Sequence, residues 1–204
     1  MILTRIGQLA PGGRFVGINR IGNSCYMIIV SPKWTEEIKG FLLKTVYTHT
    51  PNTESQCDGL ANTRAMDSSE HPAARFCLDL VVNGFNDYYL PSLNELELCY
   101  RNFKPNTRRN VTRPASSVHF ATGINNSTIP PGRAYTTVNP CQTVVTAFCE
   151  GNSEAFKRVR YWSSTEHSLN TGWSSNQDFF NGFRERNIKT FSFNVRAVRR
   201  ILIL

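Results

Sequence analysis

The sequence predicts an α+β fold in which helices flank a central antiparallel sheet. First, glycine-containing turns alternate with β-branched and aromatic residues over 12–33. Second, residues 91–105 carry a strongly marked helical pattern. Third, the stretch "FSFNVRAVRR" at 191–200 alternates like a half-buried strand. Strands therefore lie near both ends with helices between them, and we expect the 204 residues to form a single domain.

The composition, with 40% hydrophobic and 19% charged residues, is that of a folded globular protein. The longest apolar run, "CYMIIV" at 25–30, is far shorter than the roughly 20 residues of a membrane-spanning helix. The N-terminus meets Pro11 and Gly12 too early for the apolar core of a signal peptide. We therefore expect a protein made in a cytoplasm, without a membrane span.

The first 34 residues predict a β-hairpin that turns near Gly22 and Asn23, with a buried second strand at about 25–30. Asp58 is suited to cap a helix that begins in "CDGLANTRAM", and Pro72 to open the next one, "PAARFCLDLVV".

The helix at 91–105 has the clearest signals. Ser92 and Glu95 match a capping box, in which each side chain bonds a free amide of the first turn. Pro105 stops the helix. The residues that recur at helical spacing and predict its buried stripe are Leu93, Leu96, Tyr100 and Phe103.

Residues 104–138 predict a long loop, and Asn139 with Pro140 predicts a further helix that ends near Gly151. The formal net charge is +8, and the loop is basic without any acid up to residue 133. Such a patch suits phosphate, lipopolysaccharide, sulfated glycan or nucleic acid, although a plain soluble surface rich in Arg is the alternative. With Phe120 as its one aromatic residue up to residue 133, the loop makes a poor stacking platform, so nucleic acid is not expected. Its basic residues are Lys104, Arg108, Arg109, Arg113 and Arg133.

Three segments after residue 159 predict strands: "RYWSST", "GWSSNQDFFNG" and "KTFSFNVRAVRRILIL". In the first, we expect Tyr161 and Trp162 to be scaffold rather than a ligand platform, with the Trp162 N–H bonded to a backbone carbonyl. The hydroxyls that follow, and Glu166, would then bond loop amides.

Several kinds of site are not indicated. The sequence has no glycine-rich phosphate loop, no H-E-x-x-H and no alternating acids of a calcium loop. Neighbours along a strand alternate faces, so Ser163 or Ser164 with Glu166 and His167 makes a poor catalytic relay. None of the six cysteines forms a C-x-x-C pair, and we expect buried free thiols. No metal or cofactor is predicted.

Four motifs in order carry a family resemblance: "GFNDYYLPSLNELELCYRNFKP", "PPGRAYTTVNPCQTVVTAF", "YWSSTEHS" with "GWSSNQDFFNG", and "VRAVRRI". The chain resembles the DUF1566 domain, also called the Lcl C-terminal domain, in the version carried by bacteriophages and prophages. The resemblance implies a C-type-lectin-like fold, related to that of formylglycine-generating enzymes. Family members are virion or tail-associated proteins and adhesive domains, often oligomeric, and the collagen-like adhesin behind the name binds sulfated glycans.

The chain departs from relatives of that fold in two ways. No cysteine maps onto the reactive pair of the enzymes, and the E-P-N and W-N-D triplets of calcium-dependent lectins are missing. The resemblance therefore does not extend to oxidation or to calcium-dependent sugar binding.

We therefore expect a non-enzymatic virion protein of the tail tip, fibre or baseplate, which binds host surface glycan or a neighbouring virion subunit. We also expect this protein to form a homo-oligomer. The alternatives are a purely architectural virion protein, including a capsid decoration, and a formylglycine-generating type of enzyme. The expected partner-binding residues are Arg108, Arg109, Arg113 and Arg133. The expected ligand-binding residues, all within 168–187, are Trp173, Asn176, Asp178, Phe180, Asn181, Arg184 and Arg186.

Overall fold

The computed structural model describes residues 5–42, 48–116, 119–167 and 171–203. Its strands form two five-stranded sheets, and among them only β6 and β9 run parallel to each other. The first sheet has the order β1–β2–β3–β10 with β5 beside β2, and the second has the order β4–β9–β6–β7–β8. The strands of the first are β1 (Leu9–Ala10), β2 (Gly13–Ile21), β3 (Ser24–Val30), β5 (Thr128–Ile129) and β10 (Val198–Ile203). Those of the second are β4 (Glu37–Gly40), β6 (Arg160–Glu166), β7 (Trp173–Asp178), β8 (Arg184–Ile188) and β9 (Ser192–Val195).

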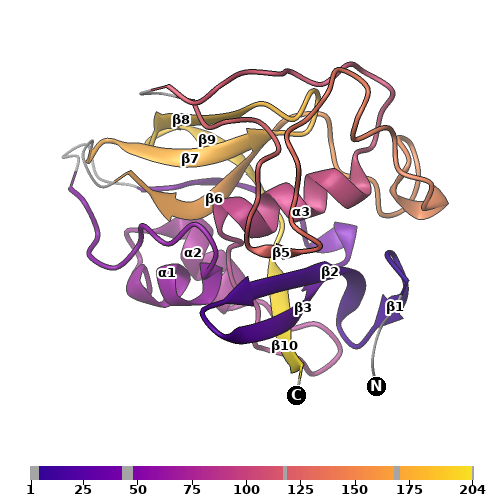
Figure 1. Cartoon of the computed structure of the whole chain (residues 1–204). Helices are drawn as coiled ribbons and strands as arrows, with labels where there is room; N and C mark the ends of the chain where they lie inside the picture. The colour runs from indigo at the N-terminus through magenta and orange to yellow at the C-terminus, as the bar shows by residue number, and fades with distance from the viewer. Residues whose placement is uncertain (1–4, 43–47, 117–118, 168–170, 204) are drawn as a thin grey trace.

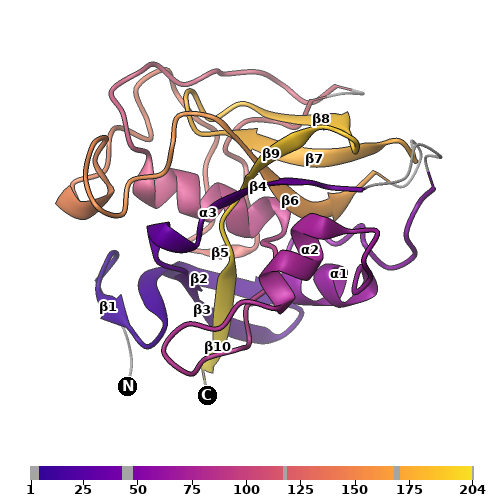
Figure 2. The same cartoon turned by 180° about the vertical axis from the view of Figure 1, so that it is seen from behind.

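Helix α3 (Leu93–Phe103) lies between the two sheets and contacts β2, β6 and β7 (Figure 1). Helices α1 (Gly59–Ala65) and α2 (Pro72–Leu78) lie to one side, against β6 and β4 (Figure 2). Single 3-10 turns occupy Lys33–Thr35 and Thr146–Phe148. The α+β class, with mostly antiparallel sheets, is therefore confirmed. The expected single central sheet flanked by helices is wrong, because α3 lies between two sheets.

The predicted hairpin is present. β2 and β3 pair in antiparallel register around a turn at Gly22 and Asn23, and Gly22 has the positive φ of 57° that such a turn requires. β3 is buried from Met27 to Val30, as expected for its apolar end.

The helix starts follow their caps. The Asp58 side chain accepts a hydrogen bond from the Ala61 amide (3.0 Å), and Pro72 stands in the first turn of α2. Both parts of the capping box form at α3, whose four predicted stripe residues are all buried. These three of the four predicted helix starts are confirmed.

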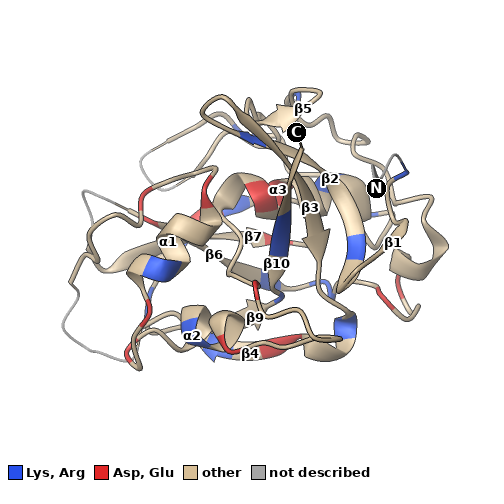
Figure 3. Ribbon diagram, turned by 90° about the horizontal axis from the view of Figure 1, so that it is seen from below, with Lys and Arg blue, Asp and Glu red and all other residues tan. Residues whose placement is uncertain are grey.

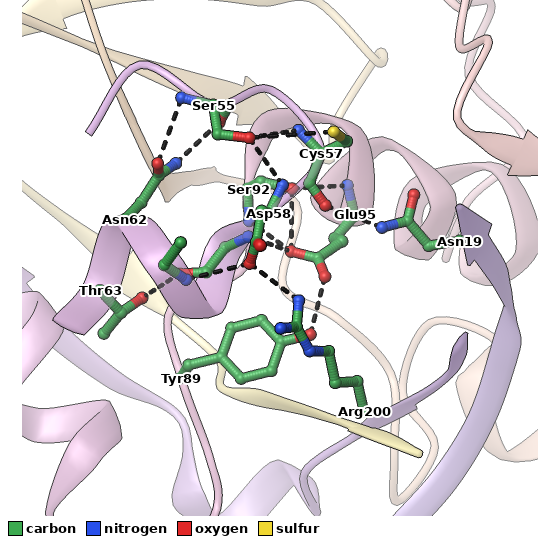
Figure 4. A network of polar contacts seen from close by, with 12 residues as sticks. Asn19, Ser55, Cys57, Asp58, Asn62, Thr63, Tyr89, Ser92, Glu95 and Arg200 are labelled. Atoms are coloured by element: carbon green, nitrogen blue, oxygen red, sulfur yellow. Dashed lines mark hydrogen bonds and ion pairs between the residues drawn. The ribbon is translucent and has the colours of Figure 1, made fainter. Parts of the chain in front are cut away.

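Glu95 ties the starts of α1 and α3 together. Its Oε2 accepts hydrogen bonds from the amides of Ser92 (2.8 Å) and Gly59 (3.1 Å), and its Oε1 from the Tyr89 hydroxyl (2.7 Å). Figure 4 shows these side chains pointing toward one another beside Arg200. Glu95 is fully buried, and its burial raises the pKa of the carboxyl above its ordinary value. We interpret this cluster as structural, because every partner belongs to the frame of the fold.

Strand β6 is buried on both faces. Tyr161 packs against Phe156 and Phe179 in the core between the sheets, whereas Trp162 packs against Phe41 and Phe193 in a second core. The expected scaffold role of both residues is confirmed. The expected hydrogen bond of the indole is wrong, because no acceptor among the described residues bonds Trp162 Nε1. Aromatic rings enclose the indole instead.

The predicted helix from Asn139 to Gly151 is also wrong, apart from the 3-10 turn. The segment lies across the end of α3 and supplies donors to carbonyls that a helix end leaves unbonded. The amide of Thr143 donates to Lys104 O (3.0 Å), and the amide of Glu150 to Pro105 O (2.8 Å). Tertiary hydrogen bonds thus replace the helical ones.

Three further expectations need correction. β8 was not predicted, because its sequence "RERNI" lacks apolar alternation, and the loop 104–138 contains the short strand β5; residues 117–118 of the loop are outside the described part. The cysteines are free thiols, but only Cys77 and Cys99 are buried and Cys141 is exposed. Its neighbours Pro140 and Gln142 belong to the irregular segment at the end of α3, which leaves the thiol at the surface.

Candidate ligand-binding surface

The basic loop and the turn after β7, 60 to 70 residues apart in sequence, lie side by side in the structure. The amide of Val111 donates to Asn181 O (2.9 Å), and the amide of Phe120 donates to Arg184 O (3.1 Å). The loop therefore runs along β8, the outer strand of its sheet (Figure 1). Both segments that the sequence marked for binding thus contribute to one surface.

Arginines stack over phenylalanines along this contact. Arg108 lies 5.2 Å from the ring centre of Phe180, and Arg158 lies 6.0 Å from the same ring. Arg113 lies 5.5 Å from the ring centre of Phe183. We call these residues the arginine–aromatic surface, which consists of Arg108, Arg113, Arg158, Arg186, Phe120, Phe180 and Phe183.

The third ring of this surface is Phe120. Arg186 lies 4.1 Å from its centre, and Arg184 lies 5.6 Å from it. His119 also packs against the Phe183 ring, with a centroid distance of 4.8 Å. Each pair except Arg158–Phe180 joins a residue of the loop to a residue of β8 or of the turn before it.

Stacking on a ring orients a guanidinium, and each such contact stabilises by about 0.5–1 kcal/mol at an exposed position. The planar N–H edge then remains available for bidentate hydrogen bonds to phosphate, sulfate or carboxylate. Because Arg108 and Arg158 already occupy the Phe180 ring, a sugar would have to displace a cation to stack there. The geometry therefore favours anionic groups over neutral sugar rings.

Glu150 neutralises one cation of this surface, because it pairs with Arg158 at 2.8 Å, whereas the acids of β7 and β8 are engaged elsewhere. Asp178 Oδ1 accepts a hydrogen bond from the Phe180 amide (2.8 Å), and burial raises the pKa of this carboxyl above its ordinary value. Glu185 Oε1 pairs with Arg160 (2.6 Å). Within the described residues, no carboxylate forms an ion pair with Arg108 or Arg113. The surface thus keeps a local excess of positive charge.

Two of the predicted ligand-binding residues are inside the protein. Asn176 is fully buried, and Arg184 has 2% of its surface exposed. The Arg184 guanidinium donates to Asn94 Oδ1 (3.0 Å) and to Ile124 O (3.1 Å), so it joins β8 to α3 and to the loop. Their assignment to a ligand site is wrong, because β7 is buried on both faces from Ser174 to Gln177 and the Arg184 side chain points inward to α3.

The other predicted residues divide by position. Phe180 and Arg186 belong to the arginine–aromatic surface, and Asp178 and Asn181 are partly exposed beside it. Trp173 is half-buried at the far end of β7, and 168–170 are outside the described residues. Of the basic loop, Arg108 and Arg113 reach this surface, and Arg109 and Arg133 are exposed elsewhere.

Sequence reasoning missed Phe183 and Arg158, and it set Phe120 aside as a single ring. No local signal could have identified these residues, because the surface forms only when the loop packs on β8. The other two rings of the surface, Phe180 and Phe183, come from the turn after β7 and not from the loop.

The stretch "YWSSTEHS" serves the frame. Ser163 Oγ donates to Ser175 O (2.8 Å), and Thr165 Oγ1 accepts from the Leu93 amide (3.0 Å). Glu166 Oε2 accepts from the Thr50 amide (3.0 Å) and pairs with the Lys189 ammonium (2.7 Å), both side chains being fully buried. The expected bond to a loop amide is confirmed for Glu166. It is wrong for Ser163, which bonds a strand carbonyl, and Thr165 bonds the first amide of α3 rather than a loop amide. Ser168 is outside the described part.

Comparisons with protein-family models, curated proteins and solved structures give no match for this chain. Among the described residues, no group of three or more His, Cys, Asp or Glu side chains could hold a metal ion. The described part also contains no helix of the length and apolar character needed to cross a membrane.

Proposed function

We propose that the chain is a non-enzymatic bacteriophage virion protein of the DUF1566 type, with a C-type-lectin-like fold, in the tail tip, fibre or baseplate. Its arginine–aromatic surface binds an anionic glycan of the host surface, such as phosphorylated lipopolysaccharide. The ordered motifs that resemble the phage family support the first part. The guanidinium groups held on phenylalanine rings are the observation that carries the second part.

Weak contacts of this kind need repetition to hold a cell. A homo-oligomer presents several identical surfaces at once, and a second attachment then becomes intramolecular. We therefore propose a homo-oligomer, and light scattering after size-exclusion chromatography measures its mass.

The direct experiment compares binding to immobilised dextran sulfate with binding to dextran. The protein should bind the sulfated polymer, weakly or not at all the neutral one, and progressively less as salt screens the contact. The double variant Arg108→Ala/Arg113→Ala should bind about tenfold more weakly, which equals the loss of two modest charged contacts.

The matched control is Arg20→Ala/Arg64→Ala, which removes the same charge from exposed positions on β2 and α1. This variant should bind nearly as tightly as the unchanged protein. An equal loss in both double variants would assign binding to net charge alone, and equal binding to dextran would exclude an anionic ligand. Purified host lipopolysaccharide, with and without its phosphates, then tests the biological ligand.

A second candidate is a purely architectural virion protein, whose loop docks an acidic partner subunit. The exposure of Arg108, Arg109, Arg113 and Arg133 favours it. Sedimentation of the protein with virions but not with host envelopes supports this role. Binding to envelopes that Arg108→Ala/Arg113→Ala abolishes supports the adhesin instead.

A further inference from the structure

A cavity of about 710 Å³ opens beside the N-terminal segment, and none of its lining residues belongs to the arginine–aromatic surface. One wall is the N-terminal segment with β2, another is the last turn of α3, and the third is the irregular segment 139–146. The volume lies within the range of about 300–1,000 Å³ that is usual for small-molecule sites. The irregular segment 139–146, which the sequence predicted to be helical, therefore lines a cavity of ligand-binding size.

The charges around this cavity are all positive. Its described lining contains Arg5, Arg14 and Arg101 but no Asp or Glu. Arg101 is already neutralised, because it pairs with the buried Glu97 at 2.8 Å. Two arginines thus remain for a ligand.

Arg14 lies on β2 and Arg5 precedes β1. β1 and β2 pair with each other, and the N-terminus lies near them (Figure 3). Arg14 makes one long hydrogen bond, 3.4 Å to Gly7 O. No carboxylate of the described residues forms an ion pair with either arginine. Two cations without a counterion at one hollow are the electrostatic condition for binding an anion.

A smaller cavity of about 280 Å³ shares Cys141 and Gln142 with the first. It adds three more basic residues, of which Lys104 is buried. The Lys104 ammonium is held by Asn110 Oδ1 (2.8 Å) and by Pro140 O (3.1 Å). The wall between the two cavities is therefore positively charged on both sides.

The large cavity also has an apolar part, formed by Ile6, Pro140 and Val145. Amide side chains of Gln8, Asn102 and Gln142 add hydrogen-bonding groups around it. An inorganic anion would contact the arginines alone. A phosphorylated sugar ring would also contact the apolar side chains and the amide side chains of the lining. We infer that this cavity binds a phosphomonoester of monosaccharide size, with its phosphate at Arg5 and Arg14, as a site distinct from the arginine–aromatic surface.

Cys141 supplies a built-in reporter for this inference. Its thiol is exposed at the wall that both cavities share, so a bound ligand should shield it. The experiment measures the rate at which iodoacetamide, a neutral reagent, alkylates Cys141, followed by mass spectrometry of the peptide. The probes are glucose 6-phosphate, inorganic phosphate and glucose.

Glucose 6-phosphate should slow alkylation in a saturable way and at lower concentration than inorganic phosphate, and glucose should have no effect. Arg14→Gln should raise the half-protecting concentration about tenfold, the loss expected for one strong charged contact. Arg20→Gln, on the same strand outside the cavity lining, should leave it unchanged.

Absence of protection, or equal protection by glucose, overturns the inference. An equal effect of Arg14→Gln and Arg20→Gln also overturns it, because binding would then follow net charge. Continued protection of the buried Cys77 and Cys99 shows that each variant is folded. Isothermal titration of Cys141→Ser with glucose 6-phosphate must give a dissociation constant equal to the half-protecting concentration. Dextran sulfate binding tests the proposed function separately, so either can fail alone.

Discussion

Buried tyrosines make the protein sensitive to alkali. Burial raises the pKa of Tyr88 to about 12 and raises the pKa of Tyr89, Tyr135 and Tyr161 well above the ordinary value. Between the ordinary value near 10 and these raised values, the unfolded chain loses protons that the folded chain retains. The free energy of unfolding should therefore fall as pH rises above about 10.

Absorbance at 295 nm, recorded with near-ultraviolet circular dichroism, checks this prediction. Most tyrosinate should appear together with the loss of tertiary signal. Titration of all tyrosines near pH 10 in a protein that keeps its dichroism would contradict the burial.

Arg184 offers a test of an interior role at a position that the sequence assigned to binding. Arg184→Met keeps much of the length but leaves Asn94 Oδ1 and the Ile124 carbonyl without their donor. Because removal of one partner from a buried charged network is costly, the free energy of unfolding should decrease by about 3 kcal/mol. Urea denaturation measures the change, and Arg113→Met at an exposed position is the control, with a change below about 0.5 kcal/mol. Similar stabilities of the two variants would exclude the interior role.

At the scale of elements, the capping box of α3 also fixes the start of α1, because its Glu95 accepts a hydrogen bond from the Gly59 amide. Ser92→Ala removes the hydroxyl that accepts from the Glu95 amide and donates to the Glu95 carboxylate (2.8 Å). The loss should be about 1–2 kcal/mol of unfolding free energy, the upper part of the range for N-caps, because Glu95 is buried.

Thermal denaturation of Ser92→Ala and of the exposed control Ser153→Ala measures that loss. The control should melt within a degree or two of the unchanged protein. A matching melting temperature for Ser92→Ala would show that the box adds nothing to the fold.

Elements with local signals could be predicted, and elements set by distant partners could not. Asp58, Pro72 and Ser92 mark helix starts through bonds and torsions within a few residues, so the sequence contains the necessary information. The segment 139–151 has helical letters, but its amides bond the end of α3, which no local pattern records. β8 is a strand because β7 pairs with it, although its own residues are polar.

The whole molecule explains why the candidate surface was only partly predicted. The sequence showed which segments were basic or aromatic. It placed Arg108 among the partner-binding residues and Phe180 among the ligand-binding residues, and the structure brings these two side chains together. Which of those side chains turn outward depends on the pairing of β7 and β8 and on the path of the loop. Asn176 and Arg184 were misplaced for that reason, and the cavity beside Arg14 was not expected at all.

The two sheets share one core, in which Val16 and Ile28 of the first sheet join Tyr161 and Phe179 around α3. Unfolding of one sheet would expose the apolar face of the other, so both should unfold in a single cooperative transition. Far-ultraviolet dichroism and tryptophan fluorescence should give coincident urea curves. Two separated transitions would mean that the sheets are independently stable.

The three tryptophans sample three different surroundings. Trp34 is 73% exposed, Trp173 is half-buried at the start of β7, and Trp162 is enclosed by rings on β6. Acrylamide should therefore quench the native emission in stages, with the Trp34 fraction first and a blue-shifted Trp162 fraction last. Native tryptophan emission therefore reports two separate properties of the molecule without any label. The Trp162 fraction should change only when the core around β6 unfolds, whereas the Trp34 fraction can be quenched while the fold stays intact.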